Sequence, residues 1–213
     1  MIAFCGFSGG FCSPERLLNL IDAHAQGIGQ WLKVAGMEKA ALLDSALQHH
    51  AWMEGHVAVE FGAFVGYTSV RLAAYHYDSP FICRSVSLEV DHVHQAIARL
   101  LLDVTKLSPC GEVWNGQVRD LVPRVLEEFG AQAVAFTFMD HRGTRFHDDF
   151  AHIVRSGSQA LVSELVADNV LNPGSPVFAW NTLSNHLMTA WSLTEFMTNS
   201  REDWMVVATG ITK

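Results

Sequence analysis

The sequence predicts an α/β fold with a doubly wound, mostly parallel Rossmann-like sheet that ends in an antiparallel pair of strands. First, short apolar runs typical of buried strands alternate with helical patterns along the chain. Second, the apolar run 57–59 leads through Glu60, Gly62 and Gly66 into a helix, as the first turn of a nucleotide-binding sheet does. Third, two apolar stretches near the end of the chain form a closing pair of strands.

The other elements are expected in an alternating order. The segment Ser13-Pro14-Glu15 opens the first helix, because serine caps a helix and proline suits its first position. Parallel strands joined by helices then require right-handed crossovers. The expected helices are 38–50, 67–75, 90–107, 118–129 and 148–156, and the expected strands are 57–59, 86–88, 112–114, 134–139, 160–167, 187–193 and 204–209. We interpret Trp114, Trp180, Trp191 and Trp204 as packing residues in or beside strands.

The length and charge of the chain limit the classes of protein to which it can belong. The chain has 213 residues, enough for one α/β domain, which we assign to 13–213, with an N-terminal extension at 1–12. Its 14 basic and 22 acidic residues give a formal charge of −8, and no basic run stands out, so nucleic acid is not expected as a partner. No apolar run reaches the roughly 18 to 20 residues of a membrane span.

Cysteine usage and the N-terminus bear on location and partners. Four cysteines without a CxxC pair suit reduced thiols, so we expect the cytoplasm or another reducing compartment. No basic segment precedes the apolar N-terminus, so no targeting segment is visible. Two interpretations remain open. The extension packs on the domain or is a remnant of a longer precursor, or Phe4, Phe7 and Phe11 form a contact arm for a protein partner.

Acidic side chains follow the ends of the expected strands, where an open α/β sheet binds its ligand. Glu89 ends the second strand and is placed to accept hydrogen bonds from ribose hydroxyls, although its spacing from Glu60 exceeds the roughly 20 residues of a dinucleotide fingerprint. Gly62 and Gly66 allow a ligand to approach the backbone, and the next helix offers its positive end to an anionic group. A nucleoside-bearing cofactor is therefore expected, although the motif is not GxGxxG.

A second set of polar side chains predicts a metal site. Asp140 and Asp168 end two strands that should lie side by side, and Asn169 follows directly. Two carboxylates and an amide oxygen suit Mg²⁺ or Ca²⁺ better than zinc, and three protein ligands leave room for a vicinal diol or catechol. The alternative is that each of these residues caps the turn that follows its strand.

These motifs resemble those of catechol O-methyltransferases, class I enzymes that use S-adenosylmethionine. The resemblance runs from about residue 17 to 210. It is carried by EFGAFVGYT at 60–68, by Glu89, by Met-Asp-His at 139–141, and by Ala-Asp-Asn-Val at 167–170 with Pro173-Gly174 after it. The last motif is the most specific of them. The resemblance implies a class I methyltransferase fold with S-adenosylmethionine and Mg²⁺ as cofactors.

The resemblance also implies roles for individual residues. Glu195 would hold the substrate's second hydroxyl, and Trp31 and Pro173 would line the substrate pocket. Asp140, Asp168 and Asn169 would bind the metal, which brings Asn169 into the catalytic set. The implied cofactor-binding residues are Gly62, Phe64, Gly66, Tyr67 and Thr68 around the methionine half, Glu89 at the ribose, and Val118, Arg119, His141 and Arg142 around the adenine. Val118, Arg119 and Arg142 replace the serine, glutamine and tryptophan of the family.

One departure from the family concerns the general base. The family has a lysine three residues after the aspartate that matches Asp140, and this chain has Gly143 there. Glycine cannot accept a proton, so another group must do so. Lys33, beside Trp31, is the candidate substitute, and an ordinary solvated lysine is its alternative interpretation. His141 and His147 are weaker candidates.

Three functions are compatible with these patterns. The first is Mg²⁺-dependent transfer of a methyl group from S-adenosylmethionine to a hydroxyl of a catechol-like small molecule. The second is a methyltransferase-like domain that is catalytically inactive and serves as a binding or structural subunit of a larger assembly. The lost lysine, the altered adenine positions and the apolar N-terminal phenylalanines favour this alternative. An NAD-dependent dehydrogenase is the third, and it leaves the Asp168-Asn169 motif unexplained.

Overall fold

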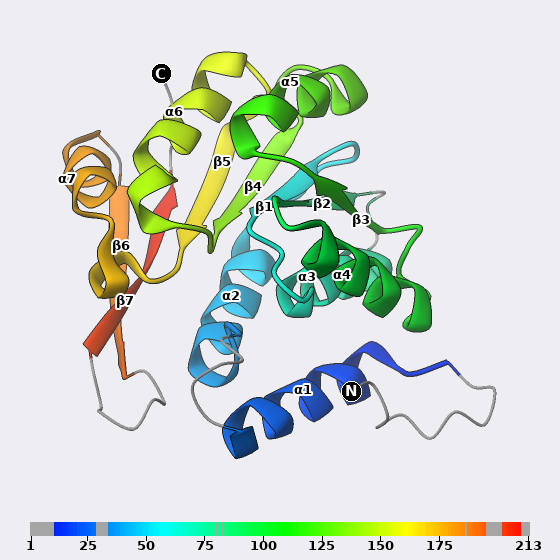
Figure 1. The fold of residues 1–213 in the computed structure, drawn as a ribbon. Helices are drawn as coiled ribbons and strands as arrows, with labels where there is room; N and C mark the ends of the chain where they lie inside the picture. Colours follow the sequence, from blue (N-terminus) through cyan, green and yellow to red (C-terminus); the bar gives the residue numbers. More distant parts are fainter. Residues whose placement is uncertain are drawn as a thin grey trace.

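A computed structural model describes residues 11–28, 34–79, 81, 83–185, 187–194 and 202–209, and for 183–185 and 187–194 it describes the backbone alone. Seven strands form one sheet in the order β3-β2-β1-β4-β5-β7-β6 (Figure 1). The first five strands of this order are parallel, and β7 lies antiparallel to both of its neighbours. The strands are β1 (Val57–Phe61), β2 (Arg84–Glu89), β3 (Gly111–Asn115), β4 (Val134–Met139), β5 (Gln159–Ala167), β6 (Leu187–Thr194) and β7 (Glu202–Thr209).

Helices cover both faces of the sheet. One face carries α1 to α4 and the other carries α5 to α7 (Figure 1). Buried apolar side chains of α5 and α6, such as Val122 and Ile153, pack on one face of β1, β2, β4 and β5, while Leu43 and Leu72 of α2 and α3 pack on the opposite face. The helices are α1 (Pro14–Ile28), α2 (Met37–His49), α3 (Tyr67–Asp78), α4 (His92–Val104), α5 (Val118–Phe129), α6 (Phe146–Ser156) and α7 (Pro176–Asn185).

The predicted fold is confirmed, including the final antiparallel pair. The Ser13 hydroxyl accepts a hydrogen bond from the Arg16 amide at 3.3 Å, as an N-cap should. Helix α7 was not predicted, because it is short, carries no charged residue and follows the turn signal Pro173-Gly174. Trp180 on α7 is 74% exposed, so its assignment as a packing residue was wrong, whereas Trp114 is fully buried.

Two short helical turns follow the strands that carry the expected site. Turn η1 (Gly143–Arg145) follows β4, and η2 (Val170–Gly174) follows β5. Strand β7 inserts between β5 and β6, which places its first residues beside η2. Among the described residues, no helix is both long and apolar enough to span a membrane.

Candidate functional site

The sheet register brings the expected site residues to one edge. Phe61 of β1 pairs with Leu88 of β2 and with Met139 of β4, and Met139 pairs in turn with Ala167 of β5. Because the strands are parallel, the residues that follow these positions meet at the carboxyl edge of the sheet. These residues are Gly62, Glu89, Asp140 and Asp168.

The turn after β1 is closely packed against its neighbours. The Gly62 amide donates to the Leu88 carbonyl oxygen at 2.9 Å. Gly66 precedes α3 with φ +91°, and a Cβ there would lie 2.6 Å from the Ala98 Cα of α4. Only glycine lets α3 begin this close to α4, and this approach fixes the direction in which the amino end of α3 points.

Glu89 is held by the turn that it faces. Its Oε2 accepts from the Phe64 amide at 2.7 Å, and its Oε1 accepts from the Asp91 amide at 2.9 Å. The side chain is buried, and the Phe64 ring lies edge-on to His94 at 4.7 Å between centroids. Each carboxylate oxygen has further acceptor capacity, so Glu89 can accept from ribose hydroxyls while it anchors the turn.

Other side chains of the first motif serve the protein interior. The Tyr67 hydroxyl donates to Asp22 of α1 at 2.9 Å and accepts from Arg71 at 2.9 Å, and burial raises its pKa to about 12. Tyr67 therefore faces α1 with its side chain and can offer a cofactor only its backbone position. Glu60 accepts from the hydroxyls of Ser69 (2.7 Å) and Ser87, and burial raises its pKa to about 7. Thr68 is buried at the start of α3.

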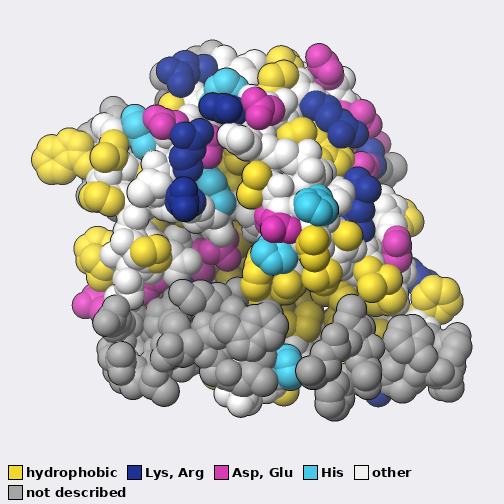
Figure 2. Space-filling model, in the orientation of Figure 1, with side chains coloured by type: hydrophobic (Ala, Val, Ile, Leu, Met, Phe, Trp, Pro, Cys, Tyr) yellow, Lys and Arg dark blue, Asp and Glu magenta, His cyan; other side chains and the backbone are white. Residues whose placement is uncertain are grey.

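The four residues matched to the adenine region differ in exposure. His141 Nε2 lies 2.9 Å from the Asp149 carboxylate, and its ring stacks on Phe146 at 4.9 Å. Its Nδ1 is buried and has no hydrogen-bond partner in the structure. Val118 is buried at the first turn of α5, while Arg119 and Arg142 are exposed. Figure 2 shows cationic side chains gathered over the region of α5 and α6.

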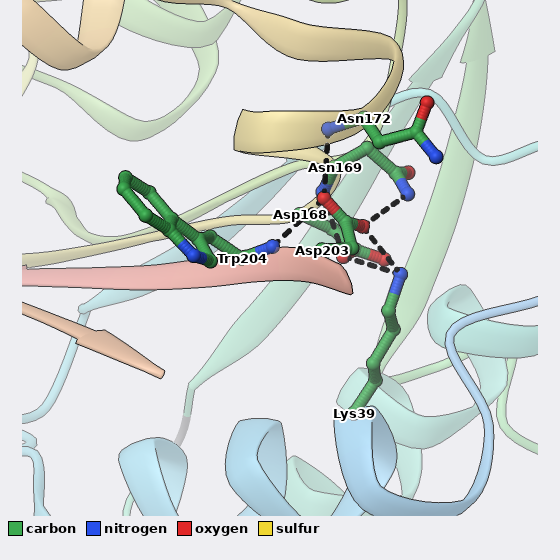
Figure 3. A network of polar contacts seen from close by, with 6 residues as sticks. All are labelled: Lys39, Asp168, Asn169, Asn172, Asp203 and Trp204. Atoms are coloured by element: carbon green, nitrogen blue, oxygen red, sulfur yellow. Dashed lines mark hydrogen bonds and ion pairs between the residues drawn. The ribbon is translucent and has the colours of Figure 1, made fainter. Parts of the chain in front are cut away.

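A buried polar network surrounds Asp168 and Asn169 (Figure 3). The ammonium group of Lys39, which comes from α2, lies 2.8 Å from Asp168 Oδ1 and 3.2 Å from Asp203 Oδ2. Asp203 Oδ2 also accepts from Asn169 Nδ2 at 2.9 Å. Burial raises the pKa of Asp168 to about 6, while the nearby ammonium of Lys39 acts in the opposite direction.

Lys39 and Asp203 were not among the predicted site residues. Lys39 occupies a helical position, where lysine usually faces solvent, yet it is only 7% exposed. Asp203 lies in the last strand and is fully buried. In the sequence, Asp203 ends the charged run Arg201-Glu202-Asp203 before the expected strand 204–209, and nothing there pairs it with Lys39.

Asp140, Asp168 and Asn169 carry oxygen atoms of the kind that a hard cation such as Mg²⁺ prefers as ligands. Asp140 is half-buried after β4, its amide donates to the Phe61 carbonyl oxygen at 3.0 Å, and Asp168 and Asn169 follow the adjacent strand. These residues supply two carboxylates and one amide, all oxygen donors. Over the described ranges, no three His, Cys, Asp or Glu side chains form a metal-binding cluster, and Asp168 Oδ1 is paired with the Lys39 ammonium at 2.8 Å.

Gly143 has a structural reason to be glycine. A Cβ at this position would lie 2.6 Å from the Gly174 carbonyl oxygen, because η1 packs directly against η2. The cis Asn172–Pro173 bond lies in η2, whose Gly174 amide donates to the Asn169 carbonyl oxygen at 3.2 Å. The turn that carries Asn169 thus occupies the space that a side chain at 143 would need.

Five predicted residues lie outside the described part of the chain. They are Phe4 and Phe7 of the expected contact arm, and Trp31, Lys33 and Glu195 of the expected site. The proposed substrate wall, the substitute base and the substrate-binding acid therefore remain predictions.

Comparison with known proteins identifies the relatives of this chain. No family model matches it. A catechol O-methyltransferase of Mus musculus is 26% identical over 165 residues, 78% of this chain and 60% of that protein. Catechol O-methyltransferase B of Danio rerio is 28% identical over 163 residues, 76% of this chain and 59% of that protein. The chain is a divergent relative of the catechol O-methyltransferases.

Solved O-methyltransferases share the fold of this chain. An O-methyltransferase from Bacillus cereus, solved in complex with SAH, superposes with a TM-score of 0.71 at 19% identity over 92% of this chain and 90% of that one. The O-methyltransferase TomG from Streptomyces achromogenes, solved with SAM, gives a TM-score of 0.70 at 18% identity, with 92% and 89% covered. The chain spans about 60% of the length of the curated vertebrate relatives described above.

Proposed function

We propose that this chain transfers a methyl group from S-adenosylmethionine to one hydroxyl of a catechol-like small molecule, with Mg²⁺ as the metal. The observation that carries the proposal is that Glu89, Asp140, Asp168 and Asn169 come to one edge of the sheet from the ends of β2, β4 and β5. This edge combines an acceptor suited to ribose hydroxyls with oxygen donors suited to a metal. The catechol O-methyltransferase relatives supply the reaction class.

The cofactor would lie across the turn after β1. Glu89 would accept hydrogen bonds from the ribose hydroxyls, and the amino end of α3 would face the carboxylate of the methionine half. Phe64 and Gly62 would border that half. Val118, Arg119, His141 and Arg142 would surround the adenine.

The substrate would bind next to the metal ligands. Asp140, Asp168 and Asn169 would hold Mg²⁺, which when bound lowers the pKa of a coordinated hydroxyl. Glu195 would accept from the neighbouring hydroxyl, and Trp31 and Pro173 would flank the ring. In the transfer, the substrate oxygen forms a bond to the methyl carbon while the carbon–sulfur bond breaks and its electron pair stays on sulfur. The hydroxyl proton passes to Lys33.

Calorimetric titration of S-adenosylmethionine, with and without Mg²⁺, tests the cofactor site. We expect micromolar affinity that Glu89→Gln weakens at least tenfold, because a glutamine amide would set an NH₂ group against the Phe64 or Asp91 amide. Glu127→Gln, an exposed residue of α5, is the matched control and should bind like the wild type. Absence of cofactor binding by the folded wild-type protein would refute the proposal.

A second candidate function is an inactive methyltransferase-like subunit, which the packing of Gly143 favours. The contact with Gly174 leaves no room for the family's lysine at this position. A methyl-transfer assay against a panel of catechols separates the two candidates. Turnover that Lys33→Met abolishes supports the enzyme. Cofactor binding without turnover on any catechol supports the inactive subunit.

A further inference from the structure

Asp203 is surrounded by hydrogen-bond donors. Its Oδ1 accepts from the backbone amides of Asn172 (3.0 Å) and Trp204 (2.8 Å). Its Oδ2 accepts from Asn169 Nδ2 (2.9 Å) and from the Lys39 ammonium (3.2 Å). All four of these groups donate, so only a carboxylate satisfies every one of them.

The contact with Asn169 determines which way its amide group faces. A primary amide carries NH₂ on one edge and oxygen on the other. Because Nδ2 points to Asp203, Oδ1 lies on the opposite edge of the amide. A metal ligand must present this oxygen, since an NH₂ group cannot coordinate a cation.

We infer that Asp203 is a positioning residue, which fixes the Asn169 amide with its oxygen toward the metal and so determines metal affinity. This inference rests on the metal site of the proposed function. Lys39 completes this network, because its ammonium group lies 2.8 Å from the Asp168 carboxylate and 3.2 Å from the Asp203 carboxylate. Asp203 would be an outer-sphere partner of the ligand Asn169. Loss of such a partner typically lowers metal affinity about 10- to 100-fold.

Replacement of Asp203 by asparagine should reverse the Asn169 amide. The two backbone donors retain an oxygen at the Oδ1 position, so the new NH₂ group takes the Oδ2 position and faces Asn169 Nδ2. Two donors cannot face each other, and rotation of the Asn169 amide resolves the conflict. The rotation turns an NH₂ group toward the metal.

Two double variants separate orientation from charge. Lys39→Met with Asp203→Asn removes one positive and one negative charge, so the net charge of the wild-type site is kept. Asn169→Asp with Asp203→Asn also keeps the net charge, but an aspartate at 169 has two equivalent oxygens. One of them can accept from the asparagine NH₂ at 203 while the other faces the metal.

The experiment measures Mn²⁺ affinity by electron paramagnetic resonance, with Mn²⁺ as a paramagnetic substitute for Mg²⁺ at oxygen ligands. Asp203→Asn should bind Mn²⁺ about 10- to 100-fold more weakly than the wild type. The Lys39→Met/Asp203→Asn variant should remain as weak, and the Asn169→Asp/Asp203→Asn variant should recover to within about threefold of the wild type. Glu202→Gln, one residue away and exposed, removes a charge but none of the four hydrogen bonds to Asp203, since Glu202 accepts from the Trp204 indole, and should bind normally.

Thermal unfolding and S-adenosylmethionine binding check that each variant is folded. Recovery in the lysine double variant instead of the aspartate double variant would show that charge alone sets the affinity, and would overturn the inference. Equal Mn²⁺ affinity in the wild type and Asp203→Asn would do the same while leaving the proposed function intact. A folded wild-type protein without Mn²⁺ affinity would overturn the metal site itself and the inference with it.

Discussion

His76 tests how strongly burial affects a titratable side chain in the core, at the end of α3 that lies away from the site. It lies near the end of α3, is 3% exposed, and contacts Trp52 edge-on at 4.7 Å between ring centroids. Both ring nitrogens are buried without a hydrogen-bond partner in the structure. Burial lowers the pKa of His76 from 6.5 to about 4. The folded protein therefore keeps this imidazole neutral in a pH range in which the unfolded chain protonates it.

The sign of the effect on stability follows from this difference. Between pH 6.5 and 4, the His76 imidazole is protonated in the unfolded state but neutral in the folded state. The free energy of unfolding therefore falls as the pH is lowered toward 4. Integration between these values gives a loss of about 2 kcal/mol from pH 7 to pH 5. His76→Phe retains an aromatic ring against Trp52 and has no group to protonate, so the variant should lack this part of the loss.

Urea unfolding at a series of pH values between 7 and 5 measures the effect as a difference between two stability curves. The curves for the wild type and His76→Phe should diverge by about 2 kcal/mol over this range. His24→Phe is the matched control, because His24 is exposed on α1 and hydrated in both states. Parallel curves for the wild type and His76→Phe would show that His76 is not held neutral by burial.

Two further predictions concern the first turn and the position of the family's lysine. Burial raises the pKa of Glu60 to about 7, so above pH 4.5 the unfolded state loses a proton that the folded state retains, and stability should fall by about 3 kcal/mol up to pH 7.5. Glu60→Gln should remove this decline in the same unfolding assay, and an unchanged decline would contradict the assignment. Gly143→Lys should lower the melting temperature and yield no gain in methyl transfer, because its Cβ would lie 2.6 Å from the Gly174 carbonyl oxygen. Gly143→Ala should be destabilised to a similar degree, whereas a stable and more active lysine variant would contradict the packing argument.

The local pattern of the sequence contained most of the fold and the outline of the site. Helix α5 and strand β4 were predicted at their observed bounds, because apolar periodicity and turn residues are local signals. The positions of Glu89, Asp140 and Asp168 at one edge also followed from the sequence, since parallel strands present their carboxyl ends together. Helix α7 was not predicted, because its uncharged sequence has a weak helical pattern and directly follows the turn residues Pro173-Gly174.

Only the tertiary structure decided how the site is supported. Lys39 and Asp203 are separated by 164 positions. They meet because β7 inserts between β5 and β6, and because α2 packs on the face of the sheet to which Met205 of β7 contributes. The contact between Gly143 and Gly174 likewise joins turns that follow two different strands. Such contacts leave no periodic pattern in the sequence, because they depend on how elements far apart in the chain pack together. The sequence therefore determined which groups reach the edge of the sheet, and the packing of distant elements determined which of them are held, oriented or excluded there.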